Sequence, residues 1–208
     1  HMLKCKASRV TGPSPCQGYA SGRSTRLSWT AAPQDSHMTA DDQTSDYDDV
    51  RKYTLAPERE QDLLEYQSEC TFIWVNKAGH PLGVIMSYIA RDGHFWLTAT
   101  SSRQRIPAIR RDGRSSIAIS SLGTQMGPKK SITYKGASVI RDDRATKDWF
   151  YPALALRLQG HRGEARMAQY IDILNTPERV IIEFAPESDI RFDGDKMYAS
   201  TPPVTERQ

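Results

Sequence analysis

Apolar and polar residues alternate through the middle of this chain, and a period of two residues predicts half-buried β-strands. Several stretches are also rich in β-branched and aromatic residues and are bounded by turn-forming residues. We expect strands over residues 70–75, 81–89, 94–99, 115–120, 131–140 and 179–185, with a short edge strand over residues 189–192. Tight turns join the first three strands as antiparallel neighbours.

A helical period replaces the two-residue period in four places. Pro57, followed by acidic residues, is a typical start for a helix that should run to about Ser68. A short arginine-rich helix should lie between the third and fourth strands. Apolar residues then recur at helical spacing over residues 143–159 and 164–174, and a glycine-containing break separates these two helices.

This order of elements predicts the fold class. Consecutive strands joined by tight turns are antiparallel, and the strand–helix–strand alternation of a parallel sheet does not occur. Closing such a sheet removes its exposed edges. We therefore predict a mainly β, α+β protein, a small antiparallel barrel with peripheral helices. The barrel domain should span residues 55–195, between an N-terminal arm of residues 1–54 and a C-terminal tail of residues 196–208.

The composition is that of a soluble globular protein with one domain. The chain has 208 residues, of which 38% are hydrophobic and 25% charged, and its net charge of +3 does not by itself indicate nucleic acid. No apolar run approaches the length of a membrane span. The three cysteines and five histidines show no metal-ligand spacing. We therefore expect a cytoplasmic protein with reduced cysteines and no metal site.

The N-terminal arm has a composition of its own. Residues 1–37 are basic, rich in Ser, Gly and Pro, and without apolar periodicity, so we expect disorder. An organellar transit peptide is an alternative, whereas a secretory signal is excluded because no apolar core segment is present. We expect His1 and Met2 to be a cloning remnant, with Met38 a candidate native start. The acidic tract over residues 41–49 is interpreted as a solvated leader.

The segment over residues 93–120, GHFWLTATSSRQRIPAIRRDGRSSIAIS, contains the most informative chemistry. A strand ends in a hydroxyl-rich turn, and the helix that follows brings five arginines against a single acid, Asp112. Hydroxyls, guanidinium groups and the free N–H groups of a helix start all bind phosphate. A solvated arginine face is the alternative interpretation. The arginines are Arg103, Arg105, Arg110, Arg111 and Arg114.

Four segments together resemble the flavin-binding split-barrel family that includes the pyridoxamine-phosphate oxidases, and within it the flavin/deazaflavin oxidoreductase branch. They are the opening helix, the block CTFIWVNKAGHPLGVIMSYIARDGHFWLTAT, the phosphate segment SSRQRIPAIRRDGRSSIAI and the exit YKGASVIRDD, over roughly residues 55–190. The resemblance implies an antiparallel split β-barrel and a homodimer with FMN or coenzyme F-420 at the subunit interface. The cofactor phosphate would lie on the turn after the third strand, and the ring against the second strand.

The resemblance also implies site residues. Thr98 matches the family's threonine on the third strand, and Ser102 with Arg103 matches its Ser-Arg pair. Gln104 stands where the family has a lysine, so that either Arg103 or Arg105 is the main phosphate ligand. The full set expected to bind the cofactor is Met86, Ser87, Tyr88, Thr98, Thr100, Ser101, Ser102, Arg103, Gln104, Arg105 and Lys130.

Several of these residues have a second interpretation. Met86 is equally suited to the core, and strand alternation allows only one of Ser87 and Tyr88 to reach the site through its side chain. Backbone groups there would bond the pyrimidine side of the ring. Lys129 and Lys130 would reach a phosphate or a polyglutamyl tail in the partner's site, and solvated loop lysines are the alternative.

The sequence therefore predicts a flavin- or deazaflavin-dependent oxidoreductase acting on a small organic substrate. We find no nucleophile–base pair and no carboxylate dyad, which fits an enzyme whose hydride chemistry belongs to its cofactor. Pyridoxamine-phosphate oxidase itself commonly has a lysine at the end of the second strand, where this chain has Tyr88-Ile89. Its C-terminal arginine motif is not recognisable here either, so pyridoxamine-phosphate oxidase activity is not expected. A non-catalytic flavin- or haem-binding module is the alternative, and nucleic-acid binding is disfavoured because the expected aromatic motifs are missing.

Overall fold

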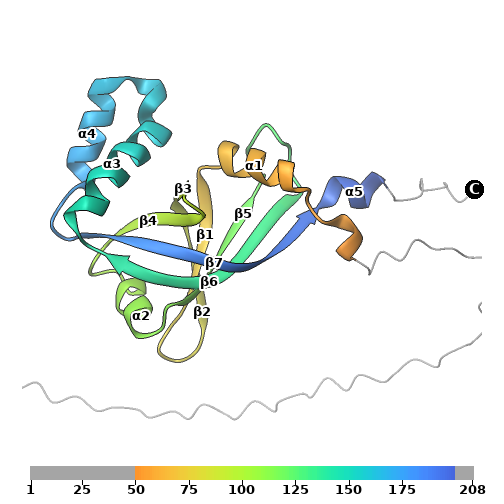
Figure 1. Cartoon of the computed structure of the whole chain (residues 1–208), viewed down its shortest axis with the longest axis horizontal. Helices are drawn as coiled ribbons and strands as arrows, with labels where there is room; N and C mark the ends of the chain where they lie inside the picture. The colour runs from red at the N-terminus through yellow and green to blue at the C-terminus, as the bar shows by residue number, and fades with distance from the viewer. Residues whose placement is uncertain (1–49, 200–208) are drawn as a thin grey trace, which may run out of the picture. The chain divides into compact units, whose positions relative to one another are not determined.

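The computed structural model describes residues 50–199, which form a seven-stranded sheet with helices around it (Figure 1). The strands are β1 (Glu69–Val75), β2 (Pro81–Ser87), β3 (Ile89–Arg91), β4 (His94–Thr100), β5 (Arg114–Ser120), β6 (Lys130–Arg141) and β7 (Arg179–Asp193). Their order in the sheet is β2-β1-β5-β6-β7-β4-β3, and each of these pairings is antiparallel. The predicted mainly β, α+β fold of the split-barrel type is confirmed.

Tyr88 marks the point where the sheet turns back on itself. β2 and β3 lie at the two ends of the strand order, yet only Tyr88 separates them in the chain. β2 pairs with β1 and β3 pairs with β4, so the single strand expected over residues 81–89 is two strands at opposite edges. The Tyr88 side chain is fully buried, and its ring centroid lies 5.5 Å from that of Phe95. This packing anchors the bend in the core.

β7 is longer than the sequence predicts because a bulge lets it pass a proline. The register of β6 and β7 shifts between Lys135 and Gly136, where Pro186 lies opposite Gly136. A proline lacks the N–H that the ladder requires, and a bulge is a place that tolerates it. A Cβ atom on Gly136 would lie 2.0 Å from the carbonyl oxygen of Ala185, so this close approach requires glycine. The edge strand expected over residues 189–192 is therefore the second half of β7.

Two helices close the ends of the barrel. The helical segments are η1 (Val50–Tyr53), α1 (Pro57–Tyr66), α2 (Arg105–Arg111), α3 (Arg144–Gln159), η2 (Gly160–Arg162), α4 (Glu164–Leu174) and α5 (Gly194–Ala199). α1 contributes Leu63 to the barrel core, and α2 contributes Ile106 and Ile109 from the opposite end (Figure 1). No helix in the described part of the chain is long and apolar enough to cross a membrane.

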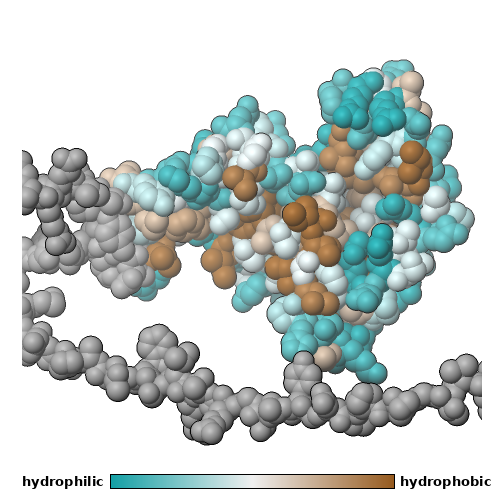
Figure 2. All heavy atoms as spheres, turned by 180° about the vertical axis from the view of Figure 1, so that it is seen from behind, coloured by the Kyte–Doolittle hydropathy of each residue, from teal (hydrophilic) through white to brown (hydrophobic). Residues whose placement is uncertain are grey.

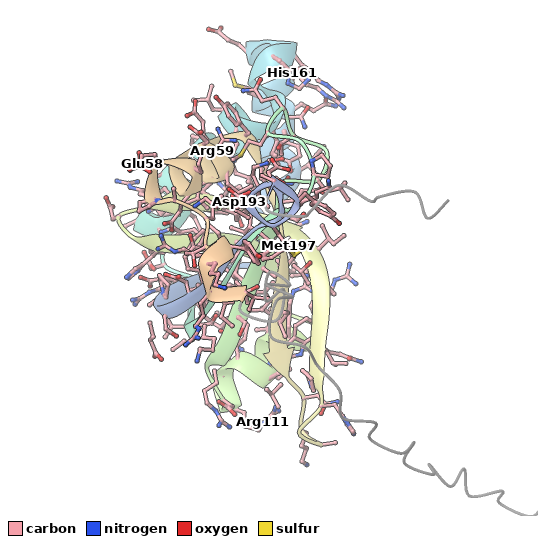
Figure 3. All side chains as sticks on the ribbon, turned by 90° about the vertical axis from the view of Figure 1, so that its right-hand side faces the viewer. Glu58, Arg59, Arg111, His161, Asp193 and Met197 are labelled. Carbon is pink, nitrogen blue, oxygen red and sulfur yellow. The ribbon has the colours of Figure 1, made fainter. Side chains whose placement is uncertain are left out.

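α3 and α4 form a hairpin that packs on the outer face of β4 and β7. Their contact is a second apolar cluster, separate from the barrel core, with Phe150, Tyr151, Leu154, Leu174 and Ile181 at its centre. Trp96 of β4 meets Trp149 of α3 edge to face, with ring centroids 5.0 Å apart. Figure 3 shows His161, at the tip of this hairpin, and Arg111, at the end of α2, at opposite ends of the molecule.

Ordered segments flank the barrel on both sides of residues 55–195. Tyr53 of η1 is buried, and Lys196 of α5 donates a hydrogen bond to the carbonyl oxygen of Thr54 at 2.8 Å. A hydrogen bond thus joins α5 to the residue that follows η1. The predictions for the remainder of the arm, including the transit-peptide alternative and the native start at Met38, lie outside the described residues, as do those for residues 200–208.

Candidate cofactor site

The turn between β4 and α2 is fixed by backbone hydrogen bonds. The N–H of Ser101 donates to the carbonyl oxygen of Glu178 at 2.7 Å, which ties the turn to the residue before β7. The N–H of Arg103 donates to the carbonyl oxygen of Thr100 at 3.0 Å. A fixed backbone therefore presents exposed polar side chains, those of Ser101, Ser102, Arg103 and Gln104.

The start of α2 offers fewer free N–H groups to an anion than the sequence suggests. The N–H of Ile106 already donates to the carbonyl oxygen of Arg103 at 2.9 Å, and that of Ala108 to Gln104 at 3.4 Å. α2 has only seven residues, and no side chain caps its start. The capacity of this segment to bind an anion therefore rests on its hydroxyl and guanidinium groups.

Arg105 is the half-buried member of the segment. Its Nε atom is buried and makes no hydrogen bond with any residue that the structure describes. Burial lowers the pKa of its guanidinium group, and the nearby charges of Arg103 and Arg179 lower it further. Buried polar atoms normally have partners, and a cation beside two other cations is stabilised by an anion. The surroundings of Arg105 therefore suit an anionic ligand.

Arg179 belongs to this cluster although the sequence analysis does not single it out. It is the first residue of β7 and pairs in register with Thr100, the last residue of β4. Neither strand pattern reveals that pairing. Among the residues that the structure describes, the guanidinium groups of Arg103, Arg105 and Arg179 make no hydrogen bond and no ion pair. The three charges are therefore uncompensated.

The hydroxyl of Thr98 lies next to the cluster but is already engaged. Its Oγ1 donates to the carbonyl oxygen of Val180 at 3.1 Å and lies 3.3 Å from the Oη of Tyr151. Burial raises the pKa of Tyr151, while the Thr98 bond and the charge of Arg179 act in the opposite direction. The pair links β4, β7 and α3, so Thr98 supports the site rather than offering a free donor.

The end of β2 presents one outward side chain. Met86 is buried and Tyr88 fully buried, whereas Ser87 between them is half-buried. β2 is an edge strand, so backbone groups along its free edge are available to a ligand. Tyr88 packs against Phe95 near the start of β4, and the arginine turn follows Thr100, about 17 Å further along the strand. Met86 and Tyr88 could contribute only through their backbone.

A hollow of about 230 Å³ joins the turn to the beginning of β2. Gln104 and Pro107 line one side of it, and Leu82 and Trp74 line the other. The hollow therefore borders the turn and the beginning of β2, whereas Ser87 lies at the other end of that strand.

Lys130 lies away from the other predicted site residues. Its side chain is buried, its Nζ donates to the carbonyl oxygen of Met126 at 3.2 Å, and it forms an ion pair with Asp195 of α5. Thr98 and Arg141 both pair with Ile181, so the residue of β6 level with Thr98 is Arg141. Lys130 lies at the other end of β6, about 36 Å along the strand from Arg141. Within one chain the structure does not bring Lys130 to the arginine turn, and the solvated-loop alternative is wrong for this residue.

A second polar cluster lies on the outer face of β4, β6 and β7. The Nδ1 of His94 lies 2.7 Å from one oxygen of Glu183, and the Nε of Arg141 donates to the other at 2.6 Å. Burial raises the pKa of Glu183, but the hydrogen bonds from Arg141 and His94 outweigh it and lower the pKa overall. Both carboxylate oxygens are satisfied, so the cluster links three strands. Between residues 50 and 199, no group of three His, Cys, Asp or Glu residues is arranged to hold a metal ion.

Comparisons with known proteins bear on the fold. No family model matches this sequence, and a search of curated proteins finds no match. The structure is similar to that of the conserved hypothetical protein Rv2991 from Mycobacterium tuberculosis, with a TM-score of 0.61 and 18% identity over 74% of this chain and 94% of that chain. A candidate 5-nitroimidazole antibiotic resistance protein from Bacteroides thetaiotaomicron gives a TM-score of 0.52 and 12% identity over 67% and 84% of the two chains. At such low identities, the structural similarity shows the fold alone.

Proposed function

We propose that this chain is a flavin- or deazaflavin-dependent oxidoreductase that acts on a small organic substrate and holds FMN or coenzyme F-420 at the interface of a homodimer. The observation that carries the proposal is the arginine cluster at the turn after β4. Arg103, Arg105 and Arg179 carry three positive charges without a counter-ion among the described residues, beside the hydroxyls of Ser101 and Ser102. This is the donor set that a phosphate group requires.

The residues present fit a phosphate-bearing cofactor. The buried, unpartnered Nε of Arg105 would gain an acceptor, and the exposed hydroxyls of the turn would donate neutral hydrogen bonds. The free backbone edge of β2 around Ser87 would orient the ring and favour negative charge on its pyrimidine side. A bound flavin or deazaflavin supplies the hydride chemistry, and the protein contributes binding, orientation and the exclusion of water.

The outer face of β2, β1, β5, β6 and the second half of β7 supports the proposed dimer. Strand register places one row of residues across it: Ile85, Thr71, Ala118, Thr133 and Ile190. The isoleucines at the two ends are 71% and 65% exposed, and the residues between them are small. An apolar surface that small side chains leave accessible suits burial against a second copy. Figure 2 shows apolar side chains gathered over the middle of the face seen there.

The proposed function is tested by absorption and fluorescence titration of the purified protein with FMN and with coenzyme F-420. We expect saturable binding of one of them at micromolar concentration or below, followed by electron transfer between the bound cofactor and a small organic acceptor. Binding of neither cofactor would remove the proposal. Tight binding without transfer to any acceptor would instead favour a non-catalytic cofactor-binding module, and a parallel titration with hemin distinguishes the haem-binding version.

A further inference from the structure

We infer that Arg179 is a third ligand of the anion site and that the three-arginine cluster selects the phosphate monoester of FMN over the phosphodiester of coenzyme F-420. The inference rests on the proposed function, because it concerns the same site. It adds a residue from β7 that the arginine-rich segment itself does not contain, and it chooses between the two cofactors.

Two backbone features place Arg179 beside the turn. Arg179 pairs directly with Thr100 across the β4–β7 ladder, and the N–H of Ser101 donates to the carbonyl oxygen of Glu178 at 2.7 Å. Directly paired residues have Cβ atoms about 5 Å apart and side chains on the same face of the sheet. The side chain of Arg179 therefore projects from the sheet beside Thr100 and Ser101, where the turn begins.

No acid among residues 50–199 offsets the charge of the cluster. Glu178, the neighbour of Arg179 in the chain, is exposed and forms no ion pair with any described residue. Asp112, the single acid of the arginine-rich segment, is held by Arg114, whose Nη2 lies 2.7 Å from a carboxylate oxygen. Because Arg105 is partly buried, excess positive charge beside it costs more than the same charge would cost in open solvent.

The charge and shape of a phosphate monoester match this cluster better than those of a diester. Near pH 7 a monoester carries between about 1.5 and 2 negative charges and has three terminal acceptor oxygens. A phosphodiester carries one negative charge and has two terminal oxygens. The guanidinium groups of Arg103 and Arg179 lie near enough to Arg105 to lower its pKa, so a ligand that concentrates its negative charge at this turn suits them best. A monoester carries that charge on one group, whereas coenzyme F-420 has a single charge on its phosphodiester and its other charges further along the polyglutamyl tail.

The inference is tested by calorimetric titration of the full chain with FMN, riboflavin and coenzyme F-420. We expect the wild type to bind FMN about 100-fold more tightly than riboflavin, and more tightly than coenzyme F-420. Arg179→Gln should weaken FMN binding by about 10- to 100-fold and leave riboflavin binding unchanged. Arg179→Lys, which keeps the charge but not the planar fork, should recover part of the loss. Arg110→Gln, an exposed position on α2, is the matched control and should behave as wild type.

The outcomes separate this inference from the proposed function. If Arg179→Gln binds FMN like the wild type, or if coenzyme F-420 binds more tightly than FMN, the inference is wrong and the proposed function stands. If the wild type binds no flavin and no deazaflavin, inorganic phosphate is titrated instead. Phosphate binding that is lost in Arg179→Gln would keep the arginine site and remove only the proposed cofactor. Failure to bind phosphate would overturn both.

Discussion

Arg157 of α3 donates a hydrogen bond to the carbonyl oxygen of Gln67, just past the end of α1, across a distance of 2.6 Å. The same Nη2 atom lies 2.6 Å from the carbonyl oxygen of Leu64. The last carbonyl groups of a helix have no partner within it, so one guanidinium from a distant helix satisfies the end of α1. The guanidinium carbon also lies 5.4 Å from the centroid of the Tyr88 ring. Arg157 thus joins the helical hairpin to the barrel at its bend.

Replacing Arg157 with Met should lower the free energy of unfolding by about 2 to 3 kcal/mol, because hydrogen bonds from a charged donor are lost and carbonyl groups are left unsatisfied. Urea denaturation followed by circular dichroism measures the change. Arg166→Met on α4 is the control, since Arg166 is exposed and bonds only the neighbouring Gln169. Equal effects of the two substitutions would contradict the role assigned to Arg157.

Removing the hydroxyl of Tyr88 should have the opposite effect from removing that of Tyr134. The Oη of Tyr88 is buried near the charge of Arg157 but lies within hydrogen-bond geometry of no described residue, whereas the Oη of Tyr134 donates to Glu60 at 2.5 Å. We expect Tyr88→Phe to raise the free energy of unfolding by about 1 kcal/mol and Tyr134→Phe to lower it by about 1 to 2 kcal/mol. Thermal and urea denaturation of the pair provide the comparison. A loss of stability in Tyr88→Phe as large as that in Tyr134→Phe would show that its hydroxyl has a partner.

Changing Arg103 and Arg105 together to Ala should weaken cofactor binding by about 3 kcal/mol or more, since each hydrogen bond from a charged group contributes about 1.5 to 3 kcal/mol. The fold should survive, because Arg103 is exposed and Arg105 only half-buried. Fluorescence titration gives the dissociation constant, and Arg110→Ala serves as the control on the same helix. Unchanged affinity in the folded double variant would remove the turn from the site.

Introducing a charge at Ile85 should prevent the proposed dimer. Ile85 is 71% exposed on the edge strand β2, and Leu156, on α3, is 65% exposed. Ile85→Glu places an unpaired carboxylate where a second copy would pack, so we expect a monomer by light scattering. Leu156→Glu changes a residue of similar size and exposure away from this face, and it should remain dimeric. A dimer in both variants, or a wild-type monomer, would refute this interface.

The ion pair of Lys130 with Asp195 should make stability depend on pH. The hydrogen bond from Lys130 lowers the pKa of Asp195 below its ordinary value of 3.8. A carboxyl group with a lower pKa in the folded state stabilises the fold above its unfolded pKa and loses this contribution as the pH falls through its folded pKa. We therefore expect Asp195→Asn to be less stable than the wild type at neutral pH, with a difference that shrinks below about pH 4.

Urea denaturation at several pH values between neutral and about pH 3 checks this prediction. Asp172→Asn is the control, because Asp172 is exposed on α4 and forms no ion pair with a described residue. The control should differ little from the wild type throughout. If the difference for Asp195→Asn stayed constant across the series, its carboxylate would not be the group that Lys130 stabilises.

Local signals predict most of the elements. The helix over residues 164–174 has the predicted bounds, because Gly163 adopts a positive φ of 88° that ends the preceding segment. The start of α3 is also set locally, since Asp143 accepts a hydrogen bond from the N–H of Thr146 at 2.8 Å. Such features depend on a few neighbouring residues, and the sequence displays them directly.

Features that depend on distant partners are not predictable in this way. In the sequence, Pro186 indicates the end of a strand. In the structure the strand continues past it, because a bulge opposite Gly136 on β6 accommodates the proline. Arg179 joins the turn only through the register of β4 and β7, and the burial of Lys130 depends on Asp195 in the last described helix. Each of these depends on which residue of a remote strand lies opposite, and single-sequence periodicity contains no register.

The position of β7 constrains how the protein is assembled as it leaves the ribosome. β7 is the last of the described strands, yet in the sheet it separates β6 from β4. Until residues 179–193 have been synthesised, the sheet can exist only as two pieces, β2-β1-β5-β6 and β4-β3. Contacts between segments far apart in the sequence form slowly and leave pairing edges exposed in the meantime. The nascent chain therefore presents the unpaired edges of β6 and β4 until its final strand arrives, and this is the stage at which a chaperone would protect it.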